Sequence, residues 1–138
     1  MCRIVRYAAR ALAARGVTMV RVRRVVIQSH EAPTRAPLVV NPGQAVGVGT
    51  RDTEWPAFVF VTADAGTGWV PARHLSIDGD RATVVTAYDT TELTVAAGTV
   101  VDVVSDDAES GWSWCRATDG TEGWVPNRAL GAISAGDA

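Results

Sequence analysis

Residues able to carry out acid–base or nucleophilic chemistry are few and scattered in this sequence. The two histidines, His30 and His74, and the two cysteines, Cys2 and Cys115, stand at spacings that match no zinc-ligand or Cys-x-x-Cys pattern. The glycine-rich residues 47–50 ("GVGT") lack the lysine of a phosphate-binding loop. We therefore expect no enzyme activity, no bound metal and no cofactor.

Noncovalent binding is better supported than catalysis, and the residues that suggest it surround one tryptophan. Asp106, Asp107 and Glu109 precede Trp112 in an acidic turn, and Glu92 lies upstream. An indole with carboxylates nearby suits a cationic side chain that stacks on the ring and pairs with the acids. The sequence predicts such a binding site, although the three turn acids taken alone are more typical of a solvated turn.

A second tryptophan shares the strand-like run that contains Trp112. Side chains alternate along a strand, so Trp112 and Trp114 lie on one face and Cys115 on the other. If Cys115 points into the core, both indoles point outward. Exposed paired indoles are unfavourable in water, so we expect either a ligand or a neighbouring unit to cover them.

The segments that position these residues belong to an internal sequence repeat with two copies. "GWVPARHL" at residues 68–75 recurs as "GWVPNRAL" at residues 123–130, and the same shift of 55 places Gly43 on Gly98. In each copy short apolar runs are separated by turn residues, and helical periodicity is absent. We expect an all-β protein of two tandem five-stranded barrels, spanning 22–77 and 83–133 and joined by a short linker. An arginine-rich extension, residues 1–21, precedes them.

Four segments of the second copy occur in a familiar order. They are "AYD" at 87–89, "ELTVAAGTVVDVV" at 92–104, "GWSW" at 111–114 and "GWVPNRAL" at 123–130. With them the second copy resembles a Src homology 3 (SH3) domain. The first copy keeps the Gly43 turn and the "GWVP" segment, and together the two resemble bacterial tandem domains of the variant SH3 type.

The resemblance implies a groove in which aromatic rings hold an extended peptide. Two of the family's groove tyrosines are replaced here, by Thr90 and Ala129, which favours a basic extended segment over an ordinary proline-rich one. The expected binding residues are Tyr88, Asp89, Glu92, Asp106, Asp107, Glu109, Trp112, Trp114 and Pro126.

The first copy is the weaker binding candidate. The shift of 55 places Pro33 opposite Tyr88, and either Trp55 or Phe58 corresponds to Trp112. Its weaker candidate residues are Trp55, Phe58, Pro71 and His74. We expect this copy to serve mainly as a structural partner.

Charge is divided unevenly along the chain. Residues 1–24 carry seven arginines and no acid, whereas the rest has six arginines against all 15 acids. An acidic body argues against nucleic-acid binding, and no apolar run approaches the ~20 residues of a membrane span. The arginine-rich leader has three interpretations: a segment outside the natural start at Met19 or loosely ordered, a helix on the acidic body, or a targeting signal.

These features favour a non-catalytic cytoplasmic adaptor that binds an extended basic segment of a partner protein. Three alternatives stay open: a structural pair of barrels whose aromatic faces pack together, a cell-wall-binding module of the bacterial SH3 type, and self-regulation by the arginine-rich leader in the acidic groove.

Overall fold

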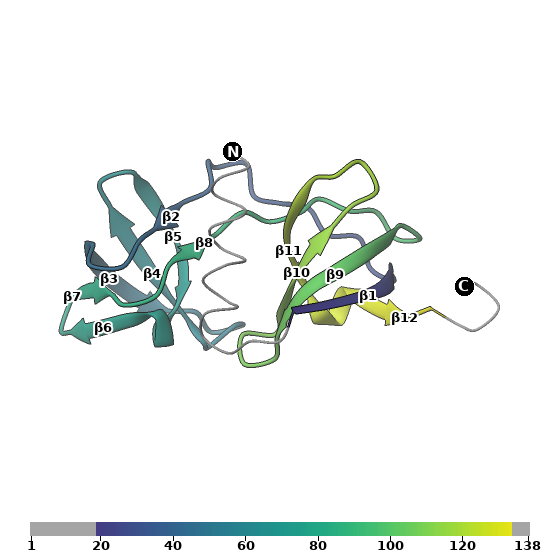
Figure 1. Ribbon diagram of the computed structural model, residues 1–138. Coiled ribbons are helices and arrows are strands. Elements are labelled where there is room, and N and C mark those ends of the chain that lie inside the picture. Colours follow the sequence, from purple (N-terminus) through teal and green to yellow (C-terminus); the bar gives the residue numbers. More distant parts are fainter. Residues whose placement is uncertain (1–18, 134–138) are drawn as a thin grey trace. The chain divides into compact units, whose positions relative to one another are not determined.

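The structure, a computed structural model, describes residues 19–133 and is all-β, as expected (Figure 1). Two single-turn 3-10 helices, η1 (Ala72–His74) and η2 (Asn127–Ala129), follow the two "GWVP" segments. The strands are β1 (Met19–Val26), β2 (Val39–Val40), β3 (Ala45–Arg51), β4 (Phe58–Ala63), β5 (Gly66–Pro71), β6 (Leu75–Asp78), β7 (Arg81–Val84), β8 (Tyr88–Asp89), β9 (Val100–Asp107), β10 (Trp112–Arg116), β11 (Glu122–Pro126) and β12 (Leu130–Ala132). Within these described residues, no helix is long and apolar enough to span a membrane.

The described chain divides into two compact units. Unit 1 is the continuous segment 35–90, and unit 2 combines residues 19–34 with residues 91–133. Unit 1 contains an antiparallel sheet of order β5-β4-β3-β7-β6 and the small pair β2-β8, whereas unit 2 contains a sheet of order β11-β10-β9-β1-β12. Unit 1 is therefore inserted in the sequence of unit 2.

The compact units do not coincide with the expected boundaries 22–77 and 83–133. Strand β1, expected to open the first copy, lies between β9 and β12 of the second (Figure 1). Strand β7, expected to open the second copy, pairs with β3 and β6 of the first. Because the two copies present similar strand edges, their sequences alone do not determine which closing strand joins which sheet.

The expected linker is part of this rearrangement. Residues 78–82 ("DGDRA") form the hairpin between β6 and β7, with Asp78 opposite Arg81 and Ile77 opposite Ala82. Gly79 in this turn has a φ of 64°, a conformation that glycine adopts without steric cost. The segment therefore turns within unit 1 and does not connect the units.

The two cores are built from corresponding valines and leucines. Unit 2 is centred on Val26, Leu93, Val95, Val101, Val103, Cys115, Val125 and Ala129. Buried residues at the corresponding places in unit 1 include Leu38, Val40, Val46, Val70 and Val84. Val70 and Val125 thus point inward in the repeated "GWVP" segments, as the repeat predicted.

Close backbone approach explains the glycine that opens the second "GWVP" segment, whereas the first glycine faces side chains. A Cβ atom on Gly123 would lie 2.8 Å from the backbone of Glu92 and Leu93. In unit 1 a Cβ on Gly68 would lie 3.3 Å from Leu38 and Thr90. The glycine of β11 therefore allows the segment carrying Glu92 to lie directly along that strand.

Candidate functional site

The candidate site of unit 2 is built around Trp112, the first residue of β10. Its side chain is partly exposed, and in the sheet it lies opposite Pro126 of β11 and Asp107 of β9. The imidazole of His30 meets the indole edge-on, with ring centroids 5.3 Å apart and an interplanar angle of 77°. One wall of the site therefore comes from the segment that follows β1.

His30 connects Trp112 to an acid. Its Nε2 lies 2.8 Å from Oε1 of Glu92, and the two side chains are 18% and 25% exposed. The backbone of His30 exchanges two hydrogen bonds of 2.8 Å with Val95. The backbone N–H of Trp124 donates to the Thr91 carbonyl at 2.9 Å. This bond holds the segment that carries Glu92 along β11. Both partners of the pair are thus positioned by strand-like bonding.

The acids of the β9–β10 turn differ in their surroundings. Oδ1 of Asp106 accepts a 3.1 Å hydrogen bond from Nδ2 of Asn127 and lies 3.1 Å from Oγ of Ser113. The Asp107 carbonyl accepts from the Gly111 N–H at 3.0 Å, closing the turn. Asp106 therefore has a structural role in addition to its charge.

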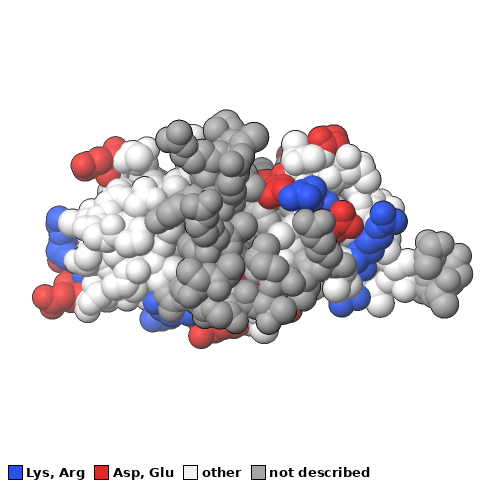
Figure 2. All heavy atoms as spheres, in the orientation of Figure 1, with Lys and Arg blue, Asp and Glu red and all other residues white. Residues whose placement is uncertain are grey.

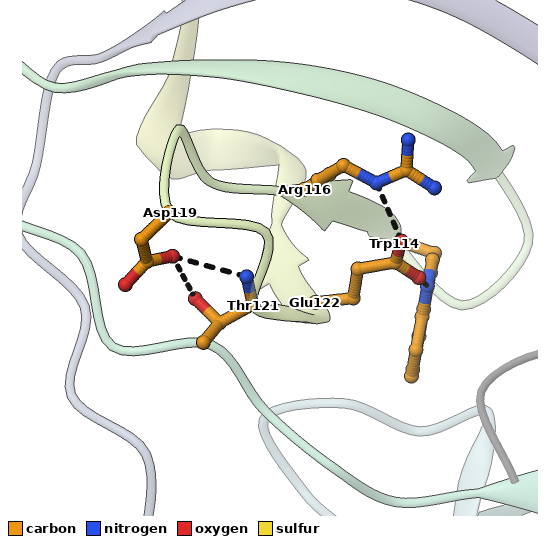
Figure 3. Close-up of polar contacts among 5 residues, drawn as sticks. All are labelled: Trp114, Arg116, Asp119, Thr121 and Glu122. Atoms are coloured by element: carbon orange, nitrogen blue, oxygen red, sulfur yellow. Dashed lines mark hydrogen bonds and ion pairs between the residues drawn. The ribbon is translucent and has the colours of Figure 1, made fainter. Parts of the chain in front are cut away.

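Trp114 does not share the exposure of Trp112, contrary to expectation. It is 1% exposed and packs edge-on against Trp124, with ring centroids 5.2 Å apart. Its Nε1–H donates to Oε1 of Glu122 at 2.8 Å, and Glu122 also pairs with Arg116 (Figure 3). Alternation along the strand did not predict the Trp124 and Glu122 side chains that lie against this indole.

Side-chain hydrogen bonds also stabilise the β10–β11 hairpin (Figure 3). The Thr121 hydroxyl donates to Oδ1 of Asp119 at 2.7 Å, and the Thr121 N–H donates to the same atom at 3.0 Å. These hydrogen bonds lower the pKa of the Asp119 carboxyl, and the bond from the Thr121 hydroxyl has the larger effect. Asp119 therefore stays ionised as a turn former at the end of the hairpin away from Trp112.

Tyr88 and Asp89 belong to unit 1, whereas Trp112 and the acids expected around it belong to unit 2. Strand β8 pairs with β2, placing Tyr88 opposite Val40 and Asp89 opposite Val39. Both side chains are buried. The predicted site is thus divided between the units, and His30 occupies in unit 2 the place expected for Tyr88.

Unit 1 has a corresponding aromatic cluster, and the register shows which residue matches Trp112. Phe58 lies opposite Pro71, as Trp112 lies opposite Pro126, so Phe58 and not Trp55 is the counterpart. Tyr88 meets His74 edge-on at 5.1 Å and Phe58 at 6.4 Å. Phe58 and Tyr88 are 6% exposed and His74 is 1% exposed, so these rings are part of a closed interior.

A hydrogen-bonded histidine completes that interior. Nδ1 of His74 lies 3.2 Å from the Ala87 carbonyl oxygen and 3.3 Å from the Thr86 carbonyl oxygen. Because a carbonyl oxygen can only accept a hydrogen bond, Nδ1 of His74 carries the hydrogen and donates to both oxygens. This burial agrees with a structural role for the first copy.

His30 is the site residue that sequence reasoning missed. "VIQSHE" (26–31) aligns with "VVTAYD" (84–89) at a shift of 58, which places His30 on Tyr88. The shift of 55 fails here because Val26 and Leu38 are 12 positions apart, whereas Val84 and Leu93 are nine apart. Aligning the opening segments separately would have found it.

Cysteine and metal chemistry have little support in the described part of the chain. Burial and, to a lesser extent, the negative charge of Asp106 raise the pKa of the Cys115 thiol to about 12, so the nucleophilic thiolate is scarce. Residues 19–133 hold no group of three or more His, Cys, Asp or Glu side chains able to share a metal ion.

Residues 84–131 match the family of variant SH3 domains. This match confirms the SH3 type for the second copy, and it begins at Val84, in β7 of unit 1. Searches of curated proteins and of solved structures gave no match. SH3-type domains are generally non-catalytic modules that commonly mediate protein binding. The tandem arrangement of two such domains stays a prediction.

Proposed function

We propose that the protein is a non-catalytic adaptor, and that the SH3-type groove of unit 2 binds an extended basic segment of a partner protein. The observation that carries this proposal is the partly exposed Trp112, with His30 against its edge and Glu92 bonded to that histidine. A guanidinium on the indole face gains cation–π attraction, and a nearby carboxylate adds a charge-assisted hydrogen bond.

The charge of the segment that forms most of unit 2 supports a basic partner. Residues 91–133 hold two arginines and seven acids. Such an excess of one sign attracts an oppositely charged ligand and speeds association at low ionic strength. On the face shown in Figure 2, acidic and basic side chains of the described residues lie interspersed, so that face offers no single charged surface. We assign selectivity to the site around Trp112.

The buried Ala129 sets the limit of this groove. The family has a tyrosine at this position, and a methyl group offers a proline ring no flat wall. The partner's cation therefore contributes more of the affinity than its prolines. In unit 1 the corresponding rings are buried, and we propose a structural role for that unit.

The test is calorimetric titration of the full chain with a synthetic extended peptide that carries arginine among prolines. A matched peptide has glutamine in place of each arginine. Trp112→Ala should weaken binding of the arginine peptide about 100-fold, the effect of losing a central aromatic anchor. Trp55→Ala in unit 1 is the control and should bind as the unmodified protein does. Equal affinity of the Trp112→Ala protein and the control would rule out this site.

A further inference from the structure

Two separate segments of the chain complete the two units in the same way. In unit 2 the Val26 N–H donates to the Thr99 carbonyl at 2.7 Å, and the Val26 carbonyl accepts from Gly98 at 2.7 Å. In unit 1 the Val84 N–H donates to the Gln44 carbonyl at 2.8 Å, and the Val84 carbonyl accepts from Gly43 at 2.7 Å. Gly43 and Gly98 are corresponding turn residues, with φ of 89° and 94°.

The equivalence continues along both segments. Val26 lies opposite Leu130 and Val84 opposite Leu75, which are the last residues of the two repeated octapeptides. One residue later, Ile27 donates to the Ala129 carbonyl at 2.7 Å and Val85 to the His74 carbonyl at 2.8 Å. Val26 and Val84 are each 1% exposed. The same equivalence holds earlier in the two strands, where Arg24 lies opposite Val101 and Ala82 opposite Val46. Residues 23–32 and 81–90 are therefore two closing segments with the same backbone register and an equivalent buried valine.

Each closing segment belongs by sequence to one copy of the repeat but completes the sheet of the other. The variant SH3 match runs without interruption from 84 to 131, so it includes residues 84–90 as the opening of the second copy. In the structure these residues complete unit 1, and residues 26–32 complete unit 2. The chain consequently passes between the units at 34/35 and again at 90/91. Exchange of an identical element is a low-cost rearrangement.

We propose that the two closing segments are interchangeable, and that the same chain also adopts a contiguous closure. In that closure residues 81–90 complete unit 2 and residues 23–32 complete unit 1. Both closures can form the same backbone hydrogen bonds and bury an equivalent valine. Their free energies then differ through side chains, chiefly through the exchange of Tyr88 and His30 between the two aromatic clusters. Interconversion requires a closing segment to leave each core, which makes it slow.

The contiguous closure changes the groove. It places Tyr88 beside Trp112 and removes His30 from Glu92, which leaves that carboxylate to a ligand cation. A ligand that binds one of two states better shifts the population toward it. This consequence rests on the proposed function: an extended basic segment should favour the contiguous closure.

Disulfide trapping in the full chain tests the exchange. The background carries Cys2→Ser and Cys115→Ala, and circular dichroism confirms that each variant folds. Arg24 lies opposite Ala132 in the structure, so the pair R24C/A132C reports the closure seen here. In the contiguous closure Ala82 takes the place of Arg24, so the pair A82C/A132C reports the other. T83C/A132C is the matched control, because a shift of one residue turns the side chain to the opposite face.

We expect R24C/A132C to form a disulfide within minutes in a glutathione buffer. A82C/A132C should form one over hours, at monomer mass and well above the T83C/A132C control. Failure of A82C/A132C to exceed that control would overturn the proposal, and so would a product found only as a disulfide-linked dimer, which would assign the exchange to two copies. Failure of R24C/A132C would overturn the exchanged closure itself.

A second measurement separates this proposal from the proposed function. The arginine peptide should raise the yield of the A82C/A132C disulfide severalfold, and Trp112→Ala should abolish that increase. An unchanged yield would overturn the coupling to ligand. The disulfide yields measured without peptide test the exchange alone. Calorimetric titration of the unmodified chain tests peptide binding alone.

Discussion

The aromatic clusters of the two units occupy the same positions but differ in what faces the first ring. In unit 1 Phe58 and Tyr88 are held together with a buried histidine, His74. In unit 2 the position of His74 is taken by Ala129, and Trp112 stays partly exposed beside His30. Three positions thus differ. Phe58, Tyr88 and His74 form a buried cluster in unit 1, whereas Trp112, His30 and Ala129 leave the tryptophan partly exposed in unit 2.

The two clusters also differ in charge. In unit 2 the histidine is hydrogen-bonded to a carboxylate, Glu92, whereas in unit 1 His74 donates to backbone carbonyls. A carboxylate at the edge of a groove attracts a cation, while paired backbone groups only fix a ring in place. The proposed function gives recognition to unit 2 and support to unit 1, and three experiments probe the contrast between the units.

The largest expected effect concerns the thiol in the core of unit 2. At pH 8 a pKa of about 12 leaves about 1000-fold less thiolate than the ordinary value of about 9, because each unit of pKa is a factor of ten. In the Cys2→Ser protein, iodoacetamide should therefore label Cys115 about 1000-fold more slowly than in urea-unfolded protein. Mass spectrometry gives both rates.

A matched thiol extends that measurement to unit 1. Val61 lies opposite Gly68 as Cys115 lies opposite Gly123, and both side chains are fully buried. Val61→Cys, made with Cys2→Ser and Cys115→Ala, should be protected to a similar degree. Labelling of Cys115 as fast as in urea would show that the unit 2 core opens freely.

The next effect is on the stability of unit 1. His74→Ala removes a buried ring that contacts Tyr88 and leaves two carbonyls without their donor. Cavity formation and lost hydrogen bonds together should lower the free energy of unfolding by about 3 kcal/mol. Urea denaturation followed by tryptophan fluorescence measures this loss. Ser76→Ala, at an exposed position two residues away, should change it by less than about 0.5 kcal/mol; similar losses in both variants would refute a supporting role for His74.

The sequence determined much of the fold because the relevant signals are local. Short valine-rich runs, the positive-φ turns at Gly43 and Gly98 and the inward Val70 and Val125 all follow from neighbouring residues. The pairing of β1 and β7 was not predictable in this way, since the two strands take equivalent places in their sheets with the same register. Exposure of Trp112 was predicted, whereas burial of Trp114 depends on contacts that alternation does not describe.

The candidate site shows the same limit. Glu92 and Trp112 were identified from residue type and order along the chain. His30 was not, because the segment after β1 that carries it joins unit 2 from the other end of the sequence and the loop after it is longer. Long-range pairing, not residue chemistry, separates the predicted site from the observed one.

The smallest expected effect is the most specific for recognition. Glu92→Gln keeps the shape of the side chain and a hydrogen-bonding oxygen for His30 but removes the charge that a ligand cation would meet. Because the carboxylate is a quarter exposed, solvent screens it and the loss should be about 1 kcal/mol, roughly fivefold in affinity for the arginine peptide. Calorimetry at low and high salt measures it, and the difference between the proteins should shrink as salt rises. Glu109→Gln removes an exposed acid from the turn before Trp112 and should cost less than twofold. If Glu109→Gln weakens binding as much as Glu92→Gln does, the attraction comes from the overall charge of unit 2, and the contrast between the two clusters is one of burial alone.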